Sequence, residues 1–441
     1  MNENRIPFYQ ALSQAVSQQG VDVMFGLMGD ANLLMADHFA RQEGQKFVAA
    51  AIEGSGVLAA MAYGQVSGKV GVATVTQGPG LSNCFSALIE GVKRRSPMVL
   101  IAGDTPSSSR ETIQDLDQYE VVKATGAGFE PVRSPATVCE DTARAFYRAQ
   151  KEKRPIVLNV PSDFVDEPVD FYPLVLPVFA GSALVSEGED FDAALGMLAS
   201  AKRPIILVGA GAVEARDDLI ALADRLEAPL ATTLKAKDLF REHPANMGLF
   251  GTLSTPLAYE AIAKADCIAA FGASLHYFTT EHGGLLRGKR VVQVSNDAAD
   301  LGKTFHPDAA LVSDPAQTAR LFVQWLDEAE IEPSGFTDEL DLENLASHPL
   351  PKGRSAGEGA VPFEVALERL NELLPKNRVL TTDGGRFMTE VWCRVAADTP
   401  RHFLSGTDSG SIGMGLQGAI GTALADPGRR VCHFTGDGGF M

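Results

Sequence analysis

The sequence contains few cysteines, and their arrangement signals no structural site. The five cysteines are widely spaced, and none belongs to a C-x-x-C pair: Cys84, Cys139, Cys267, Cys393 and Cys432. A disulfide framework needs a dense set of cysteines, and a zinc site needs closely spaced pairs. The cysteines therefore indicate neither, and they fit a protein of the reducing cytoplasm.

Positive charge is also scarce. The chain has 38 Lys and Arg residues against 56 Asp and Glu residues, so its formal net charge at pH 7 is -18. A surface of that sign repels the phosphates of nucleic acids and anionic lipid headgroups. We therefore expect a small-molecule partner, no nucleic acid and no membrane.

Apolar runs long enough to cross a membrane are missing too. A membrane-spanning helix needs about 20 apolar residues, and no stretch of this sequence approaches that length. The first residues, MNENRIPFYQ, lack the basic and then apolar pattern of a signal peptide. Apolar residues nevertheless make up 45% of the chain, as in globular proteins. We expect a soluble, cytoplasmic protein.

The chain contains three blocks in which apolar strands alternate with helical segments. The first includes FVAAAIE, VGVATVT and PMVLIAG as strands, the second opens at RPIILVGAGA and the third at RVLTTDGG. Strands that are apolar on both faces and separated by helices predict parallel sheets covered by helices. The expected fold class is α/β, with three doubly wound parallel-sheet domains at 1–165, 190–330 and 360–441, joined by linkers at 166–189 and 331–359.

The third block ends in a strand that runs into Gly436-Asp437-Gly438-Gly439. Ligands of parallel sheets lie beyond the carboxyl ends of the strands. Glycines there let backbone N–H groups approach a phosphate, and a carboxylate can hold Mg²⁺. Taken alone, the same four residues also make a plain turn.

The first block offers two similar signals. Gln77-Gly78-Pro79-Gly80 lies between a strand and a helix, with Asn83 in the first helical turn, and Glu53 follows the strand FVAAAIE. A glycine-rich turn before a helix suits an anionic or polar ligand. Taken singly, the glycine turn is explained equally well as a tight strand-to-helix turn, and Glu53 is better explained as an ordinary acid at a helix start.

Two glycine patterns bear on nucleotide binding. Residues 54–59, GSGVLA, match a dinucleotide fingerprint, but the next strand, VGVATVT, does not end in the acidic residue that a ribose needs. Gly209-Ala210-Gly211 is half of such a fingerprint at a strand end. A nucleotide in the middle block therefore stays open, whereas a nicotinamide enzyme is not indicated.

The combination of motifs is more specific than its parts. Glu53, Gly78-Pro79-Gly80 with Asn83, KRPIILVGAGA, TDGGRF and TGDGG occur in the order seen in thiamine-diphosphate-dependent enzymes. The sequence resembles the acetolactate synthase and pyruvate decarboxylase branch of that family over essentially its whole length. The resemblance implies a pyrimidine-binding domain, a central Rossmann-like domain and a diphosphate-binding domain. It also implies a homodimer or homotetramer with active sites between subunits.

The resemblance implies roles for residues around the cofactor, which reacts through a carbanion at C2 of its thiazolium ring. Glu53 would drive the aminopyrimidine ring to the imino form, and Asp437 would bind Mg²⁺. Gly410 would hold the cofactor's amino group through its carbonyl, and Ile412 would wedge the cofactor into a bent shape. The other implied cofactor-binding residues are Gly78, Gly80, Asn83, Asp383, Gly384, Gly385, Arg386, Gly436, Gly438 and Gly439.

Substrate-side signals favour two reactions. The loop 25–32 is similar to the loop of 2-oxo acid decarboxylases whose aspartate moves protons, here Asp30, whereas Ile113-Gln114-Asp115 resembles an acetolactate synthase segment. We expect acetolactate-synthase-like carboligation of a 2-oxo acid with catalytic residues Glu53, Asp30 and Gln114. Simple decarboxylation is the first alternative, and a non-catalytic relative with a nucleotide-binding middle domain is the second.

Two further expectations concern flavin and the chain end. Acetolactate synthases carry an Arg-Phe-Asp-Asp run around their flavin, whereas this chain reads SLHYF at 274–278, so we expect no FAD. Met441 follows the Gly-Asp-Gly-Gly turn by two residues, and the family's diphosphate domain continues beyond it. We therefore expect residues 360–441 to be an incomplete diphosphate-binding domain.

Overall fold

The computed structural model describes residues 5–109, 112–178, 188–350 and 359–440. The chain divides into two units. The first unit contains residues 1–179, 377–388 and 404–441, and the second contains residues 180–376 and 389–403. The predicted third segment, 360–441, thus contributes residues to both units.

The first unit is built on a six-stranded parallel sheet with the order β3-β2-β4-β5-β7-β6. Its strands are β2 (Val23–Gly26), β3 (Lys46–Ala49), β4 (Gly71–Val75), β5 (Met98–Asp104), β6 (Gly128–Pro131) and β7 (Pro155–Pro161). The order reverses between β2 and β4. Ligands of open parallel sheets bind at such a reversal, beyond the carboxyl ends of the strands.

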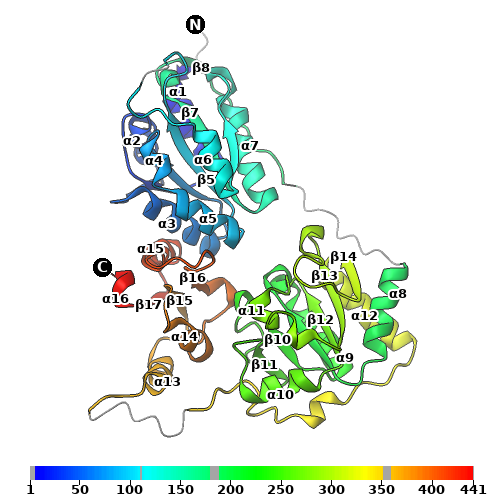
Figure 1. Cartoon of the computed structure of the whole chain (residues 1–441). Coiled ribbons are helices and arrows are strands. Elements are labelled where there is room, and N and C mark those ends of the chain that lie inside the picture. Colours follow the sequence, from blue (N-terminus) through cyan, green and yellow to red (C-terminus); the bar gives the residue numbers. More distant parts are fainter. Residues whose placement is uncertain (1–4, 110–111, 179–187, 351–358, 441) are drawn as a thin grey trace. The chain divides into compact units, whose positions relative to one another are not determined.

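Helices cover both faces of this sheet (Figure 1). One face packs against α1 (Phe8–Gln18), α2 (Leu33–Arg41) and α7 (Val138–Glu152). The other packs against α3 (Glu53–Ser67), α4 (Pro79–Ser82), α5 (Phe85–Arg94) and α6 (Gln118–Thr125). Because side chains alternate along a strand, Val99 and Ile101 of β5 face the first set and Leu100 and Ala102 face the second.

A smaller sheet completes the first unit, with the order β16-β15-β17. Its strands are β15 (Arg378–Thr382), β16 (Phe403–Ser405) and β17 (Arg430–Phe434), followed by α16 (Asp437–Phe440). Between β16 and β17 lies α15 (Gly415–Ala425), which packs on α3. A Cβ added to Gly421 of α15 would lie 2.1 Å from the backbone oxygen of Ala59 in α3, so only glycine allows this approach.

The second unit is built on a parallel sheet with the order β11-β10-β9-β12-β13-β14. Numbered within the unit this is 3-2-1-4-5-6, the order of Rossmann folds. The strands are β9 (Pro204–Val208), β10 (Leu230–Thr232), β11 (Asn246–Leu249), β12 (Cys267–Phe271), β13 (Arg290–Ser295) and β14 (Ala309–Val312).

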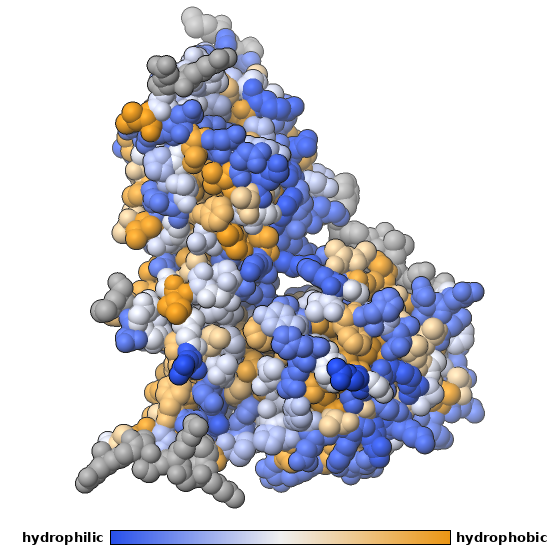
Figure 2. All heavy atoms as spheres, viewed as in Figure 1, coloured by the Kyte–Doolittle hydropathy of each residue, from blue (hydrophilic) through white to orange (hydrophobic). Residues whose placement is uncertain are grey.

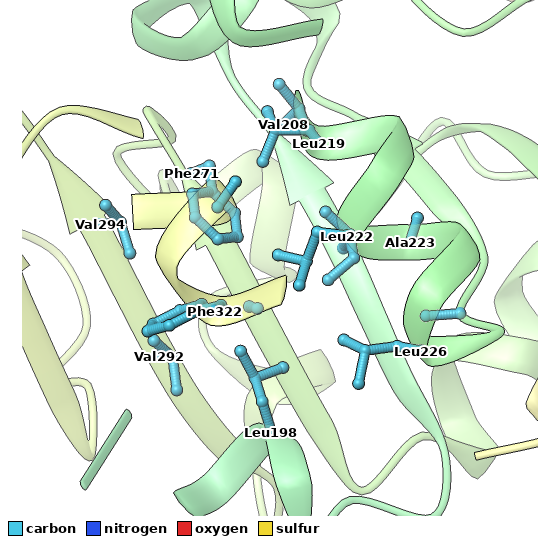
Figure 3. Packing of buried hydrophobic residues seen from close by; sticks show 14 of the residues in the cluster. Leu198, Val208, Leu219, Leu222, Ala223, Leu226, Phe271, Val292, Val294 and Phe322 are labelled. Carbon is cyan, nitrogen blue, oxygen red and sulfur yellow. The ribbon is translucent and has the colours of Figure 1, made fainter. Parts of the chain in front are cut away.

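The core of the second unit lies on both faces of its sheet. Figure 3 shows side chains of α8 (Glu189–Ala199), α9 (Arg216–Leu226) and α12 (Pro315–Glu328) meeting those of β9, β12 and β13. Leu222, Phe271 and Phe322 are fully buried in this cluster. The opposite face packs against α10 (Pro256–Lys264). The unit also contains α11 (Tyr277–Thr280), α13 (Phe363–Leu373) and most of α14 (Met388–Arg394).

The segments predicted as linkers are described in part, because residues 179–187 and 351–358 lie outside the described residues. In the first, β8 (Pro168–Asp170) pairs antiparallel with β1 (Arg5–Pro7). In the second, Phe336 and Leu345 are buried against the sheet of the second unit. Short 3-10 helices lie at Pro135–Thr137, Ser162–Phe164, Ala210–Ala215, Leu234–Ala236, Gly284–Leu286, Ala298–Asp300, Phe336–Glu339 and Pro400–His402.

The predicted fold class is confirmed, since the chain is α/β with several parallel sheets covered by helices. On the face shown in Figure 2, hydrophobic residues form scattered groups among hydrophilic ones. Among the helices of the described ranges, none is long and apolar enough to cross a membrane.

Candidate active site

The carboxyl edge of the first sheet brings together most of the predicted site residues of the first block. The loop after β2 carries Asp30, and Glu53 begins α3 just after β3. The turn after β4 carries Gly78 and Gly80, and the segment after β5 carries Gln114. All four connections follow neighbouring parallel strands, so they meet at one edge, and β2 and β4 flank the reversal of strand order.

The loop after β2 is fixed by Asn32, whose side chain is buried. Its Oδ1 accepts the backbone N–H of Gly29 at 2.7 Å. Its Nδ2 donates to the carbonyl of Leu27 at 3.1 Å and to Oγ1 of Thr74 at 3.1 Å. Asp30 lies exposed between these anchored points. Sequence reasoning gave Asn32 no role, but its buried amide is hydrogen-bonded at both ends and fixes the loop.

Glu53 is the first residue of α3 and is partly exposed. The Nδ2 group of Asn83 donates a hydrogen bond to its Oε2 at 3.0 Å. The two helix starts lie so close that a Cβ added to Gly54 would be 3.0 Å from the backbone oxygen of Asn83. Burial, and then the charge of Glu53, raises the pKa of the neighbouring Cys84 thiol. The carboxylate is therefore held on one oxygen by an amide donor.

The turn after β4 holds the segment that carries Gln114. Gly78 has φ of +56°, and a Cβ there would lie 2.0 Å from the backbone oxygen of Gln114. The Nε2 group of Gln77 donates to Oε1 of Gln114 at 2.8 Å. The N–H of Gly78 donates to Oε1 of Gln118 at 2.8 Å, and Gln118 is buried. Gln77 and Gln118 are thus positioning residues that the sequence did not reveal.

A second cluster forms where β15 and β17 end in the first unit. Asp383 is fully buried, and its carboxylate accepts the backbone N–H groups of Gly413 at 2.9 and 3.0 Å and of Met414 at 3.3 Å. A Cβ added to Gly439 would lie 2.0 Å from Oδ2 of Asp383. The segments TDGG and TGDGG therefore meet at this carboxylate. Asp383 serves the protein's own backbone here, and its predicted contact with diphosphate stays a prediction.

The turn at 436–439 has room on its outer side. Among the residues that the structure describes, no atom lies within 4 Å of a Cβ added to Gly438. Asp437 is exposed, and its Oδ1 accepts the N–H of Gly438 at 2.9 Å. No group of three or more His, Cys, Asp or Glu side chains in the described ranges forms a metal site. One exposed carboxylate beside the open Gly438 fits Mg²⁺ that takes its other ligands from a diphosphate and water.

Three more predicted residues surround this cluster. Gly410 has φ of +80° and open space around it, and Ile412 is 63% exposed. Arg386 is exposed as well. A Cβ at Gly384 would lie 3.5 Å from Cγ1 of Ile412. Gly384, Gly385, Gly410 and Ile412 thus lie near one another, and their roles stay predictions.

Close backbone packing explains why glycine stands at position 209 of the middle block. A Cβ added to Gly209 would lie 2.3 Å from the backbone oxygen of Gly272. The turns after β9 and β12 therefore need glycine to pass each other. Beyond them the rings of His276, Tyr277 and Phe278 lie tilted against one another, with centroids of adjacent rings 4.1 Å apart. The expectations on flavin and on a nucleotide in the middle block stay predictions.

Three family models of known proteins match this chain. The model of the thiamine pyrophosphate enzyme N-terminal TPP binding domain matches residues 7–121, and that of the central domain matches residues 191–322. The model of the C-terminal TPP binding domain matches residues 383–441. Together they match more than half of the chain, and the matched ranges include the predicted residues at both clusters.

Individual relatives match nearly the whole chain and about three quarters of their own length. The acetolactate synthase large subunit of Parasynechococcus marenigrum is 29% identical, over 98% of this chain and 72% of its own length. Sulfoacetaldehyde acetyltransferases of Rhodobacter capsulatus and Alcaligenes xylosoxydans are 28% and 29% identical, over 99% and 97% of this chain and 78% and 76% of theirs. The chain belongs to the family of thiamine pyrophosphate-dependent enzymes, in its acetolactate-synthase-like branch.

Proposed function

We propose that the protein uses thiamine diphosphate and Mg²⁺ to join a 2-oxo acid to a second carbonyl compound, as an acetolactate-synthase-like carboligase. The observation that carries this proposal is the Glu53 carboxylate at the edge of the first sheet. It lies beside the reversal of strand order, and Asn83 holds its Oε2 at 3.0 Å. When bound, the cofactor supplies an electron sink for the carbon atom of the broken bond.

The chain's own residues supply proton handling. Glu53 would share a proton with the aminopyrimidine ring of the cofactor, and Asn83 fixes the orientation of the carboxylate. Asp30 is exposed at the same edge and can exchange protons with substrate. Gln114, fixed by Gln77 at 2.8 Å, offers an amide to a polar substrate group.

Diphosphate binding falls to the second cluster. Asp437 would hold Mg²⁺, and the space beside Gly438 would let the diphosphate approach the backbone of the turn 436–439. Gly410 and Ile412 would contact the rest of the cofactor. The exposed guanidinium of Arg386 adds positive charge near the diphosphate.

A second copy of the chain is the proposed partner. Large apolar side chains are exposed on the connections and helix starts that follow β2 to β5: Met28, Leu33, Leu34, Ile52, Phe85 and Ile113. Exposed apolar residues gathered at one edge are typical of an interface. A homodimer or homotetramer would cover the edge that carries Glu53.

The test is a screen of 2-oxo acids with the full-length protein, thiamine diphosphate and Mg²⁺. It reads both released carbon dioxide and condensed products. Glu53→Gln should bind the cofactor and lose about 10²- to 10⁴-fold of turnover, the usual contribution of a general acid–base group. Glu120→Gln is the matched control, because Glu120 also lies in the first turn of a helix beside this sheet.

Each outcome separates the alternatives. Carbon dioxide without condensed product would replace carboligation by simple decarboxylation, which the exposed Asp30 favours as second candidate. Absence of thiamine diphosphate binding would contradict catalysis altogether and favour a non-catalytic relative. Near-normal turnover of Glu53→Gln would remove the assigned role of Glu53.

A further inference from the structure

Residues 406–414, here called the apex loop, connect β16 to α15 and carry Gly410 and Ile412. The loop is held from α5, a helix of the first sheet that lies more than 300 positions earlier in the chain. Oε1 of Glu90 accepts the backbone N–H of Asp408 at 2.9 Å, and Oε2 accepts that of Ser409 at 2.6 Å. Both oxygens of one carboxylate thus bind one side of the loop.

Arg94, one turn further along α5, holds the start of the loop. Its Nη2 donates to the carbonyl of Ser405 at 2.6 Å, and its Nε lies 3.6 Å from Oδ2 of Asp408. The side chains of Arg94 and Asp408 are each 12% exposed, and Glu90 is fully buried. Ion pairs and charge-assisted hydrogen bonds are stronger away from water than at the surface.

The far side of the loop is held by another carboxylate. Asp383 accepts the N–H groups of Gly413 and Met414. Three residues, 410–412, stand between the two anchored points. Three residues reach at most about 11 Å when fully extended, so the anchors confine Gly410 and Ile412 to a small region.

We propose that Glu90 and Arg94 are positioning residues for thiamine diphosphate, because they hold the apex loop that presents Gly410 and Ile412 to the cofactor. This inference rests on the proposed function. The described contacts of the two residues are with the apex loop and the end of β16. Glu90 acts through the backbone N–H groups of Asp408 and Ser409, and Arg94 acts through the carbonyl of Ser405 and the side chain of Asp408.

Glu90→Gln is the direct test. Glutamine keeps the size of the side chain, but its amide group has one acceptor oxygen and places N–H groups toward one of the two backbone donors. In the full-length protein without cofactor, amide hydrogen exchange at Asp408 and Ser409 should accelerate at least tenfold. The dissociation constant of thiamine diphosphate with Mg²⁺, measured by calorimetry, should rise about tenfold to a hundredfold.

Asp141→Asn is the matched control. Asp141 is also a fully buried carboxylate of the first unit, and it accepts the backbone N–H of Arg133 at 3.0 Å. It lies on α7, across the sheet from α5. Its substitution should lower stability and leave both the exchange of residues 406–414 and the cofactor affinity unchanged.

The outcomes distinguish this inference from the proposed function. Wild-type protein that binds no thiamine diphosphate would overturn both. Wild-type binding together with unchanged affinity in Glu90→Gln would overturn the positioning role alone, whether or not the loop exchanges faster. If Glu90→Gln does not fold, Arg94→Lys replaces it, because lysine keeps the positive charge and loses the bond to Ser405; unchanged affinity in that variant counts equally against the proposal.

Discussion

Single residues at the candidate site shape the backbone of its loops, in addition to offering side-chain groups. Gly78 has φ of +56°, and its missing Cβ makes room for the carbonyl of Gln114. The carboxylate of Asp383 accepts hydrogen bonds from the N–H groups of Gly413 and Met414. A carboxylate and a glycine that look like ligand contacts in the sequence thus also shape the loops that would meet the ligand.

Gly78→Ala should destabilise the protein and displace Gln114. The new Cβ would meet the oxygen of Gln114 at 2.0 Å, and positive φ adds strain, so we expect a loss of at least about 3 kcal/mol in the free energy of unfolding. Urea unfolding measures it. Gly20→Ala is the control that separates backbone strain from atomic collision. Gly20 also has positive φ, +81°, but no described atom lies within 4 Å of a Cβ added there. That control should lose only about 1 kcal/mol, and equal losses would contradict the collision.

Thiol chemistry gives a second prediction at this scale. Burial and the charge of Glu53 raise the pKa of Cys84, and burial raises the pKa of Cys393 to about 11. A raised pKa lowers the thiolate fraction at any pH below it, and only the thiolate reacts quickly. At pH 8, iodoacetamide should therefore alkylate both thiols far more slowly in the folded protein than in the protein unfolded in urea. Peptide mass spectrometry after iodoacetamide treatment measures this, and equal rates would contradict it.

At the scale of elements, helix α3 is enclosed by packing on more than one side. The first sheet packs on Val57 and Met61, whereas Ala62 and Val66 pack with Val379 and Leu404 of the smaller sheet. The segment GVLAAMAYGQV has small or apolar residues at nearly every position because it has almost no face toward water. Helix α15 contacts α3 at Gly421.

Gly421→Ala tests this helix contact. The added Cβ would lie 2.1 Å from the backbone oxygen of Ala59, so the helices must separate, at a cost of about 1–3 kcal/mol in unfolding free energy. Gly196→Ala in α8 is the control, since nothing lies within 4 Å of its Cβ. Alanine there should stabilise the helix by about 0.5–1 kcal/mol. A shift of the same sign in both variants, by thermal or urea unfolding, would be evidence against the contact.

The sequence predicted the elements better than the contacts between them. Apolar strands and their connections revealed the parallel sheets, and strand ends located Glu53, Asp30 and the glycine turns. The partners of these residues were not predictable, because they come from far along the chain. Asn83 donates to Glu53 from 30 positions away, and Glu90 binds Ser409 from 319 positions away. Local patterns carry no information on such pairs.

At the scale of the whole molecule, the exposed apolar side chains at the edge of the first sheet predict self-association. Ile113→Asp should lower the molar mass measured by light scattering to that of a smaller assembly, because a charge cannot be buried in the interface without a partner. Val312→Asp is the control, since Val312 is 51% exposed on β14 of the second unit. A monomeric wild-type protein, or an unchanged mass for Ile113→Asp, would contradict the proposed second copy.

The discontinuous first unit has a consequence for biosynthesis. Ala59 and Ala62 of α3 leave the ribosome early, but their partners on α15 and β16 follow about 340 to 360 residues later. At 5–20 residues per second, the delay is roughly 17 to 70 s. During that time the second unit has its whole sequence up to residue 376 available for folding, while α3 still presents apolar surface without its later partners. Nascent chains stalled before residue 404 should therefore recruit a chaperone that binds apolar segments.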